Sequence, residues 1–201
     1  MPVELWFPAP ILVFDVDAAV RDVTRSKVMA YLETDGAKRD VAPAATESVE
    51  TTYFVQKQSV LEDAGLDELK SILLGIGKSF IEGLGLAPFP LEVERAWINV
   101  FRPGAQEAQH SHDASLLSAS YYVDAPDGCG DLVFPDPVGA RRSYRAFTRT
   151  SGTSFFTTSD VAFKPQPGRF VMFESWMPHS VQCNKSDKVR ISLAFNLRRA
   201  G

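Results

Sequence analysis

Residues 165–197 read PQPGRFVMFESWMPHSVQCNKSDKVRISLAFNL and contain two runs typical of β-strands, RFVMFE and RISLAFNL. In the second run every other residue is apolar, namely Ile191, Leu193, Phe195 and Leu197. The residues between them are Arg190, Ser192, Ala194 and Asn196. Because side chains alternate between the two faces of a strand, we expect the apolar face to bury against a layer. The other face, small and polar, suits the inside of a barrel that leaves room for a ligand.

Two helices are predicted before this region. Residues 17–32 and 66–81 carry apolar side chains at loosely helical spacing, and neither segment contains proline. Asp17 is a suitable N-cap for the first helix. Gly83 and Gly85 are expected to end the second helix.

The pattern changes from helices to strands after Pro90. Residues 35–60 predict a long polar loop with one short strand near 52–55. Four further runs are rich in β-branched and aromatic residues and are bounded by Pro, Gly and Asp turns: 92–101, 116–123, 130–135 and 161–165. So many short strands predict a sandwich or barrel with the N-terminal helices packed outside it.

The chain has three histidines, and their positions suit a metal site. His110 and His112 lie in the run QHSHD, and His179 lies in WMPHSV. Residues two apart on a strand share a face, so His110 and His112 can aim their rings at one point. A third imidazole from a distant strand would complete the clamp. Imidazole binds iron, zinc, copper and nickel, so the ligand type alone does not select the metal.

Length and charge exclude several other classes. The 201 residues, 45% of them hydrophobic, suffice for one domain, and a net charge of −4 argues against a general nucleic-acid surface. Residues 1–16 lack the basic start of a signal peptide and predict a first strand. No apolar run approaches the roughly 18 residues of a membrane span, so the cytosol is the expected location. Cys129 and Cys183 match no metal motif and are expected to be reduced thiols.

The order of the motifs resembles a known family. The chain reads HxH at 110–112, LSASYYV at 117–123, GDLVFPDP at 130–137, PxPGRFVMFESWMPHSV at 165–181 and RISLAFN at 190–196. This order resembles the Fe(II)/2-oxoglutarate-dependent oxygenases, and within them a branch of small 2OG-Fe(II) oxygenases. The resemblance covers residues 91–198 and is most specific in the closing segment.

The resemblance implies the architecture. We expect a mainly β, α+β chain whose residues 91–198 form a double-stranded β-helix, the jelly-roll core shared with cupins. Residues 1–90 would support this core with helices and strands. The whole chain, 1–201, would then be a single oxygenase domain.

The resemblance also implies roles for individual residues. His179 would be the distal iron ligand, Arg190 would hold the distal carboxylate of 2-oxoglutarate through its planar fork, and Ser192 would support Arg190. Tyr122 is a candidate donor to 2-oxoglutarate, with a packed core tyrosine as the alternative. Asn99 is a candidate for the cosubstrate pocket, with a turn-side hydrogen bond as the alternative. One stretch with few strand signals is either a lid against an acidic substrate or a solvated loop, and it holds Arg141, Arg142, Arg145 and Arg149.

The metal ligands differ from the usual pattern of this family. The usual triad is two histidines and a carboxylate in the form HxD or HxE, whereas this chain reads HSHD at 110–113. In a regular strand Asp113 points away from His110 and His112, so it could bind metal only at a bend or bulge. Three ligand sets stay open. They are all three histidines; His112 and His179 alone with water; or one early histidine with Asp113 and His179.

Two functions from different classes follow. The first is an Fe(II)/2-oxoglutarate dioxygenase that converts 2-oxoglutarate and O2 to succinate and CO2 while oxidising a C–H bond of a small, amino-acid-like substrate, with ascorbate as a stimulant. Hydroxylation is the main expectation, and halogenation, desaturation and ring closure stay open because they use the same iron centre. The second is a cupin-like metal-binding isomerase or ligand-binding module without oxygenase activity. The expected partner is the small-molecule substrate, with no nucleic acid and no membrane, and a homodimer is left open.

Overall fold

The computed structural model describes residues 9–34, 37, 39–41, 49–54, 60–137 and 158–201. Its elements follow one another as β1 (Ile11–Asp15), α1 (Ala18–Leu32), β2 (Asp40–Val41), β3 (Val49–Thr51), α2 (Val60–Asp63), α3 (Asp67–Gly83), β4 (Leu91–Phe101), β5 (Glu107–His110), β6 (Leu117–Asp124), β7 (Leu132–Pro135), β8 (Asp160–Phe163), β9 (Arg169–Glu174), β10 (His179–Val181) and β11 (Arg190–Arg199). The four arginines of the candidate lid lie outside the described residues.

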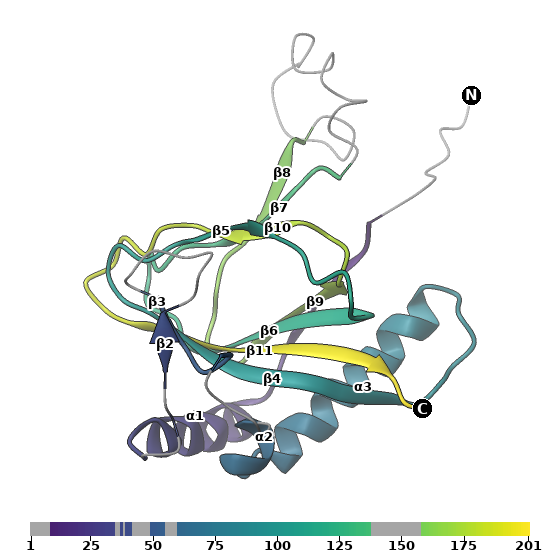
Figure 1. Cartoon of the computed structure of the whole chain (residues 1–201), viewed down its shortest axis with the longest axis horizontal. Coiled ribbons are helices and arrows are strands. Elements are labelled where there is room, and N and C mark those ends of the chain that lie inside the picture. Colours follow the sequence, from purple (N-terminus) through teal and green to yellow (C-terminus); the bar gives the residue numbers. More distant parts are fainter. Residues whose placement is uncertain (1–8, 35–36, 38, 42–48, 55–59, 138–157) are drawn as a thin grey trace, which may run out of the picture.

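The strands form two sheets that lie over one another (Figure 1). The larger sheet has the order β1-β9-β6-β11-β4-β3-β2, and the smaller has the order β5-β10-β7-β8. From β4 onward the chain passes between the two sheets, so that β4, β6, β9 and β11 fall in the larger sheet and β5, the β7–β8 pair and β10 in the smaller. Neighbouring strands run antiparallel. This alternation is the topology of a double-stranded β-helix, and the predicted fold is confirmed.

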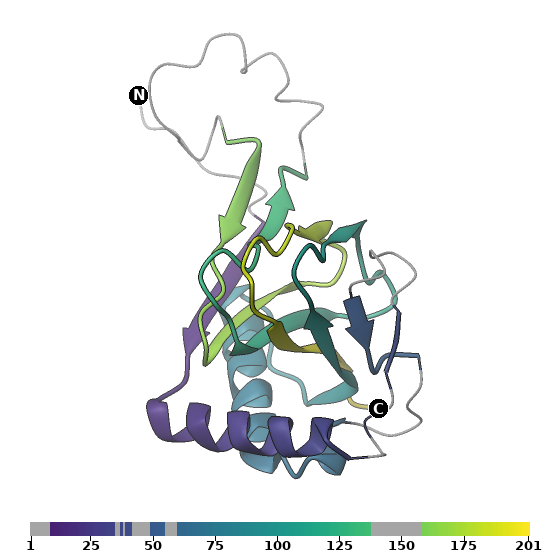
Figure 2. The same cartoon turned by 90° about the vertical axis from the view of Figure 1, so that its left-hand side faces the viewer.

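The helices cover the outer face of the larger sheet (Figure 2). Helix α1 begins at Ala18, and the Asp17 carboxylate caps it by accepting a 2.9 Å hydrogen bond from the Val20 N–H. Helix α3 buries its predicted apolar stripe, including Leu69 and Leu73, against the sheet. Both helix predictions are confirmed.

Gly77 lets α3 lie close to the sheet. A Cβ at this position would lie 3.0 Å from Leu91 Cδ1 and 3.4 Å from Leu197 Cδ2. Interiors are closely packed, so a side chain here would require Leu91 and Leu197 to shift. The glycine therefore contributes through its small size.

Strand β11 lies in the centre of the larger sheet, between β4 and β6. Its apolar face packs into the core shared with the helices, through Ile191, Leu193, Phe195 and Leu197. Its other face lines a cavity between the sheets through Arg190, Ser192 and Ala194. The division of this strand into a core face and a ligand face is confirmed.

The strand predicted near 52–55 is wrong in position, because strand β3 ends at Thr51. The Thr52 hydroxyl accepts a hydrogen bond from the Ile98 N–H at 3.0 Å, and the Tyr53 N–H donates to Thr51 Oγ1 at 3.2 Å. Threonine hydroxyls that bond to nearby backbone compete with the strand ladder. The chain therefore turns where β-branched residues predicted a strand.

Cys129 and Cys183 are both free, as the sequence predicted. Among the described residues, no helix has the length and apolar character needed to cross a membrane.

Candidate metal centre and cosubstrate pocket

A cavity of about 210 Å³ lies between the two sheets. Strands of both sheets and the turn after β3 form its walls. Six of the residues that the sequence singled out line it: Asn99, His110, His112, His179, Arg190 and Ser192. These residues are far apart in the chain and come together only in the folded structure.

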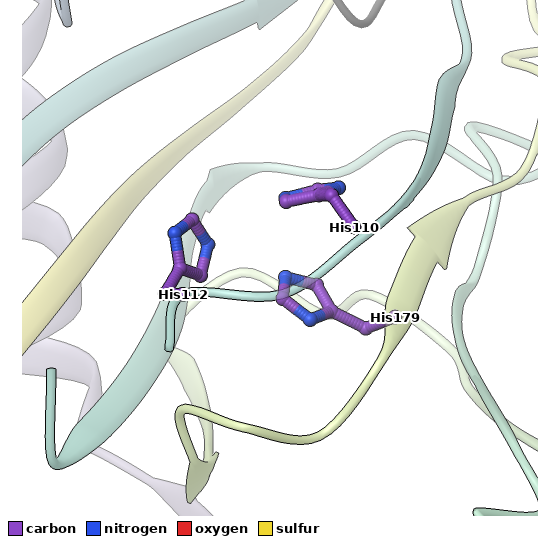
Figure 3. A group of neighbouring side chains, drawn as sticks. All are labelled: His110, His112 and His179. Carbon is purple, nitrogen blue, oxygen red and sulfur yellow. The ribbon is translucent and has the colours of Figure 1, made fainter. Parts of the chain in front are cut away.

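The three histidine rings face one another (Figure 3). Each offers one ring nitrogen, and these three atoms lie within 4.8 Å of one another. The ring centroids of His110 and His179 are 4.3 Å apart, and His112 lies 5.1 Å from His110 and 5.2 Å from His179. A single metal ion can therefore be reached by all three side chains after small ring rotations.

The neighbours in the sheet place His110 and His179 side by side, since the two residues are register partners in the β5/β10 pair. His112 lies two residues beyond the end of β5, where its backbone N–H donates to the Ser175 carbonyl at 2.9 Å. Strand alternation was thus not the reason that His110 and His112 converge. A turn held by Ser175 brings His112 to the cluster.

Hydrogen bonds fix the orientation of two of the rings. His110 Nδ1 lies 2.9 Å from the Ala108 carbonyl oxygen, and His179 Nδ1 lies 3.0 Å from the Met177 carbonyl oxygen. A carbonyl oxygen only accepts, so in each bond Nδ1 carries the proton and Nε2 keeps its lone pair. Metal-binding histidines are commonly oriented in this way.

The cluster favours neutral imidazole. Burial lowers the pKa of His112 to about 4, with the neighbouring His110 acting in the same direction. Burial, together with His110 and His112, lowers the pKa of His179 to about 3, against a smaller opposing effect of its bond to Met177. Neutral rings present lone pairs, so these two are ready to bind metal at neutral pH.

Asp113 lies outside the histidine cluster and is exposed. Its carboxylate accepts a 2.7 Å hydrogen bond from the Ser111 hydroxyl. The structure therefore brings together the three histidines and leaves the alternative ligand at the surface.

Arg190 is 1% exposed and lies inside the cavity wall. Its guanidinium donates to the Gly130 carbonyl at 3.1 Å and lies over the rings of Phe101 and Tyr122, at 4.9 and 5.1 Å. Among the described residues no carboxylate forms an ion pair with it, and its buried Nε has no hydrogen-bond partner. A buried guanidinium in this state is costly unless an anion binds it.

The backbone of Gly130 contacts the chain that follows β10. A Cβ on Gly130, whose φ is +89°, would lie 2.0 Å from the Gln182 carbonyl oxygen. Glycine is therefore required at this position. Its close approach helps to place the carbonyl that holds Arg190.

A row of residues crosses the larger sheet beside Arg190. Register pairs join Thr51 to Asn99, Asn99 to Ser192, and Ser192 to Tyr122. The first three line the cavity, whereas Tyr122 lies behind the lining, under the guanidinium. Burial raises the pKa of Tyr122 to about 12, and its hydroxyl has no hydrogen-bond partner among the described residues. The protonated hydroxyl is available to donate.

A family model described as "Putative 2OG-Fe(II) oxygenase" matches residues 95–196, which is half of the chain. The chain belongs to this 2OG-Fe(II) oxygenase family. The match spans the histidine cluster and Arg190, so the residues of the cavity lie within the family region. No curated protein matches the sequence of this oxygenase significantly.

Solved structures of similar fold include several oxygenases. A prolyl-4-hydroxylase of Pseudomonas putida is 18% identical, with a TM-score of 0.60 over 96% of this chain and 94% of that one. The epimerase SnoN, in complex with Fe3+, alpha ketoglutarate and nogalamycin RO, is 13% identical, with a TM-score of 0.66 over 96% and 80%. A prolyl hydroxylase from Trichoplax adhaerens is 12% identical, with a TM-score of 0.65 over 94% and 83%. At these identities the likeness establishes a shared fold.

The residues of the oxygenase cavity fit the two groups for which the family is named. Three imidazole side chains around one point suit a divalent transition metal such as Fe(II). The buried Arg190 Nε lacks a partner among the described residues, and the guanidinium suits a carboxylate.

Sequence reasoning missed Glu107, which lines the cavity of the oxygenase. Glu107 is the register partner of Val181, and His110 is the register partner of His179. Between these two pairs, β5 therefore contains one residue more than β10. This is a β-bulge, which allows residues three apart to share a face. Ala108 and Gln109 accordingly point to solvent, and Glu107 and His110 point inward. No sequence signal for this bulge was available.

An aromatic wall at the cavity was also missed. Tyr53 contacts Phe54 and Trp97 edge-on at centroid distances of 4.8 and 5.0 Å, and Trp97 contacts His112 at 5.9 Å. Phe54 is 51% exposed. The wall therefore runs from the surface to the histidine cluster.

Lowering the pH from 7 to 5 is expected to destabilise the metal-free oxygenase. The pKa values of His112 and His179 in the folded state, about 4 and 3, lie below the ordinary 6.5. As the pH falls through 6.5 the unfolded chain takes up protons while the folded cluster stays neutral, so stability is lost between 6.5 and about 4. At pH 5 the buried His179 lowers the free energy of unfolding by about 2 kcal/mol, and His112 lowers it by less because solvent screens its partly exposed ring.

Urea denaturation with a chelator at pH 7, 6 and 5 measures this effect. The matched control is the double variant His112→Gln, His179→Gln, which should show a shallower pH dependence. Equal pH dependence of the two proteins would contradict the assignment of neutral buried rings.

Proposed function

We propose that this oxygenase is an Fe(II)/2-oxoglutarate dioxygenase that hydroxylates a C–H bond of a small, amino-acid-like substrate. One observation carries the proposal: a cluster of three histidines and a buried arginine, which has no carboxylate partner among the described residues, share one cavity. The histidine cluster suits a metal ion, and the arginine suits a carboxylate of a dicarboxylate ligand.

His110, His112 and His179 are proposed to hold the metal. The Nδ1 bonds of His110 and His179 to backbone carbonyls leave their Nε2 atoms free for the metal and limit the rotation of the rings. When bound, Fe(II) and 2-oxoglutarate supply the oxidation, in which O2 is reduced as the keto acid is decarboxylated to succinate. The exposed position of Asp113 favours the three-histidine set over the alternative with Asp113.

Arg190 is proposed to bind the distal carboxylate of 2-oxoglutarate. Its guanidinium is held by Gly130 and by the rings of Phe101 and Tyr122, so it is already oriented before the anion arrives. Asn99 and Ser192 would form the adjoining polar wall, and Tyr122, which lies behind the lining, would support the guanidinium. The burial of Arg190 in the cavity wall favours the dioxygenase over a cupin-like isomerase or ligand-binding module, because neither of these would need the arginine.

The substrate is proposed to lie against Tyr53, Phe54 and Trp97, because this aromatic wall leads from solvent to His112. Two of the similar structures are named prolyl hydroxylases, which supports hydroxylation as the outcome. SnoN is named an epimerase, so products should be identified without assuming a hydroxyl group.

Purified protein given Fe(II), 2-oxoglutarate and O2 is expected to form succinate slowly in the absence of substrate. Ascorbate should increase the yield, because uncoupled turnover oxidises the metal. Succinate is measured by mass spectrometry, with reactions lacking Fe(II) or O2 as controls. Succinate at the same rate in the controls, or none in the complete reaction, would contradict the proposed activity.

Free and carrier-bound amino acids are the first substrates to screen, by stimulation of CO2 release from 2-oxoglutarate. The masses of the products then distinguish hydroxylation from halogenation, desaturation, ring closure and epimerisation.

A further inference from the structure

The cavity contains one carboxylate that the proposed function does not use. Glu107 lines the same cavity as His110, His179 and Arg190. Among the described residues it forms no hydrogen bond and no ion pair, and its electrostatic neighbours are His110 and Arg190. Burial raises the pKa of Glu107, against the opposing effects of these two neighbours. A partly buried carboxylate in this state is unfavourable without a cation.

The charges expected in the loaded cavity leave one positive charge unbalanced. A ferrous ion and a 2-oxoglutarate dianion cancel, and neutral histidine ligands add nothing. The positive charge of Arg190 then stays unbalanced. In a site with two histidines and a carboxylate, the carboxylate ligand supplies the missing negative charge. Here His112 occupies the third position, and Glu107 is the acidic side chain among the described residues that line the cavity.

We propose that Glu107 is an outer carboxylate of the metal site, which stabilises the bound cation electrostatically and supplies the negative charge that the three-histidine ligand set lacks. The proposal rests on the metal site of the proposed function. Glu107 is not in the group of residues whose ligand atoms lie within reach of one another, so its effect is through space or through a bound water. It is a positioning residue, and it does not replace a histidine as ligand.

The bulge in β5 explains how one segment provides both functions. It places Glu107 on the inner face together with His110, although the two are three residues apart. Its outward segment also supplies the Ala108 carbonyl that orients the His110 ring. A regular strand would turn Glu107 into solvent when His110 points inward.

Metal affinity without 2-oxoglutarate or substrate tests the proposal. Glu107→Gln removes the charge with little change of shape and is expected to weaken binding of Mn(II) or Co(II) by about tenfold to hundredfold. Glu107→Asp keeps the charge and should retain most of the affinity. Asp113→Asn is the matched control, because it removes an exposed carboxylate next to the same cluster and should change the affinity by less than about twofold. Thermal unfolding of each metal-free variant verifies folding.

The same substitution in a His112→Asp protein distinguishes an effect of the Glu107 charge on metal affinity from an effect on local structure. In a His112→Asp protein the metal already has a carboxylate ligand, so Glu107→Gln should cost clearly less than in the wild-type chain. An equal cost in both backgrounds, or an affinity of Glu107→Gln within twofold of wild type, would overturn the proposal. If the wild-type protein binds neither metal, the proposed function fails. If it binds metal and Glu107→Gln binds equally well, only the role of Glu107 fails.

Discussion

Arg190→Ala is expected to weaken 2-oxoglutarate binding by about 100-fold or more. The variant removes a fork that can donate two charge-assisted hydrogen bonds to a carboxylate inside a buried cavity, where each bond is worth about 1.5–3 kcal/mol. The wild-type guanidinium is held in place by Gly130 and two aromatic rings, so little ordering is needed when the anion binds. Affinity is measured by calorimetry on protein loaded with Ni(II), which prevents turnover.

Two further variants make this result specific. Arg190→Lys keeps the charge without the planar fork and should lose affinity to an intermediate degree. Arg198→Ala is the control on the same strand, because Arg198 is exposed and pairs with Glu92 at the surface; its affinity should equal that of wild type. Unchanged 2-oxoglutarate binding in Arg190→Ala would favour the cupin-like alternative.

His179→Ala is expected to abolish stoichiometric metal binding. His179 is 5% exposed, and its ring centroid lies 4.3 Å from that of His110 and 5.2 Å from that of His112; it is the ligand that β10 supplies. Removing it leaves two ligands from one segment of the chain, and a hydrophobic space beside Phe134 and Phe173 in place of the third ligand. Metal content after dialysis against Fe(II) or Co(II) under anaerobic conditions gives the result. Stoichiometric metal in this variant would refute the assignment.

The same measurement on His110→Ala and His112→Ala distinguishes the ligand sets that the sequence left open. Three imidazole ligands predict severe loss in both variants. A site of His112 and His179 alone predicts a mild effect of His110→Ala, and an Asp113 site predicts loss in Asp113→Asn. Since the chain has three histidines, Co(II)-shifted imidazole NMR signals can be assigned by this set of variants.

Periodicity was enough to predict most of the fold. The two long helices, the strand at 190–197 and its division into a core face and a ligand face follow from spacing alone, because each repeats over several turns or residue pairs. The position of Arg190 inside the cavity followed from the same alternation. The resemblance to the oxygenase family predicted that this arginine and the distant histidines share one site, which residue spacing alone cannot predict.

The predictions from the sequence fail where a local hydrogen bond or an irregular strand pairing replaces the regular alternation of a strand. Thr52 uses its hydroxyl to bond to backbone, which ends β3 early. His112 reaches the cluster through a turn bonded to Ser175. Glu107 was missed because period-two reasoning places it opposite to His110, and a bulge of one residue reverses that conclusion. Such features depend on partners that are distant in sequence.

The central position of β11 has a consequence for the order in which the molecule forms. This strand follows all the other strands along the chain, yet it separates β4 from β6 and carries Arg190 and Ser192. Pairing across such long separations closes large loops and slows folding. Partly folded states that lack β11 have an incomplete sheet and no anion site, so 2-oxoglutarate can recognise only chains that have finished folding. The cosubstrate would then act as a reporter of late refolding events, and its addition would shift the equilibrium toward the native state without accelerating the early steps.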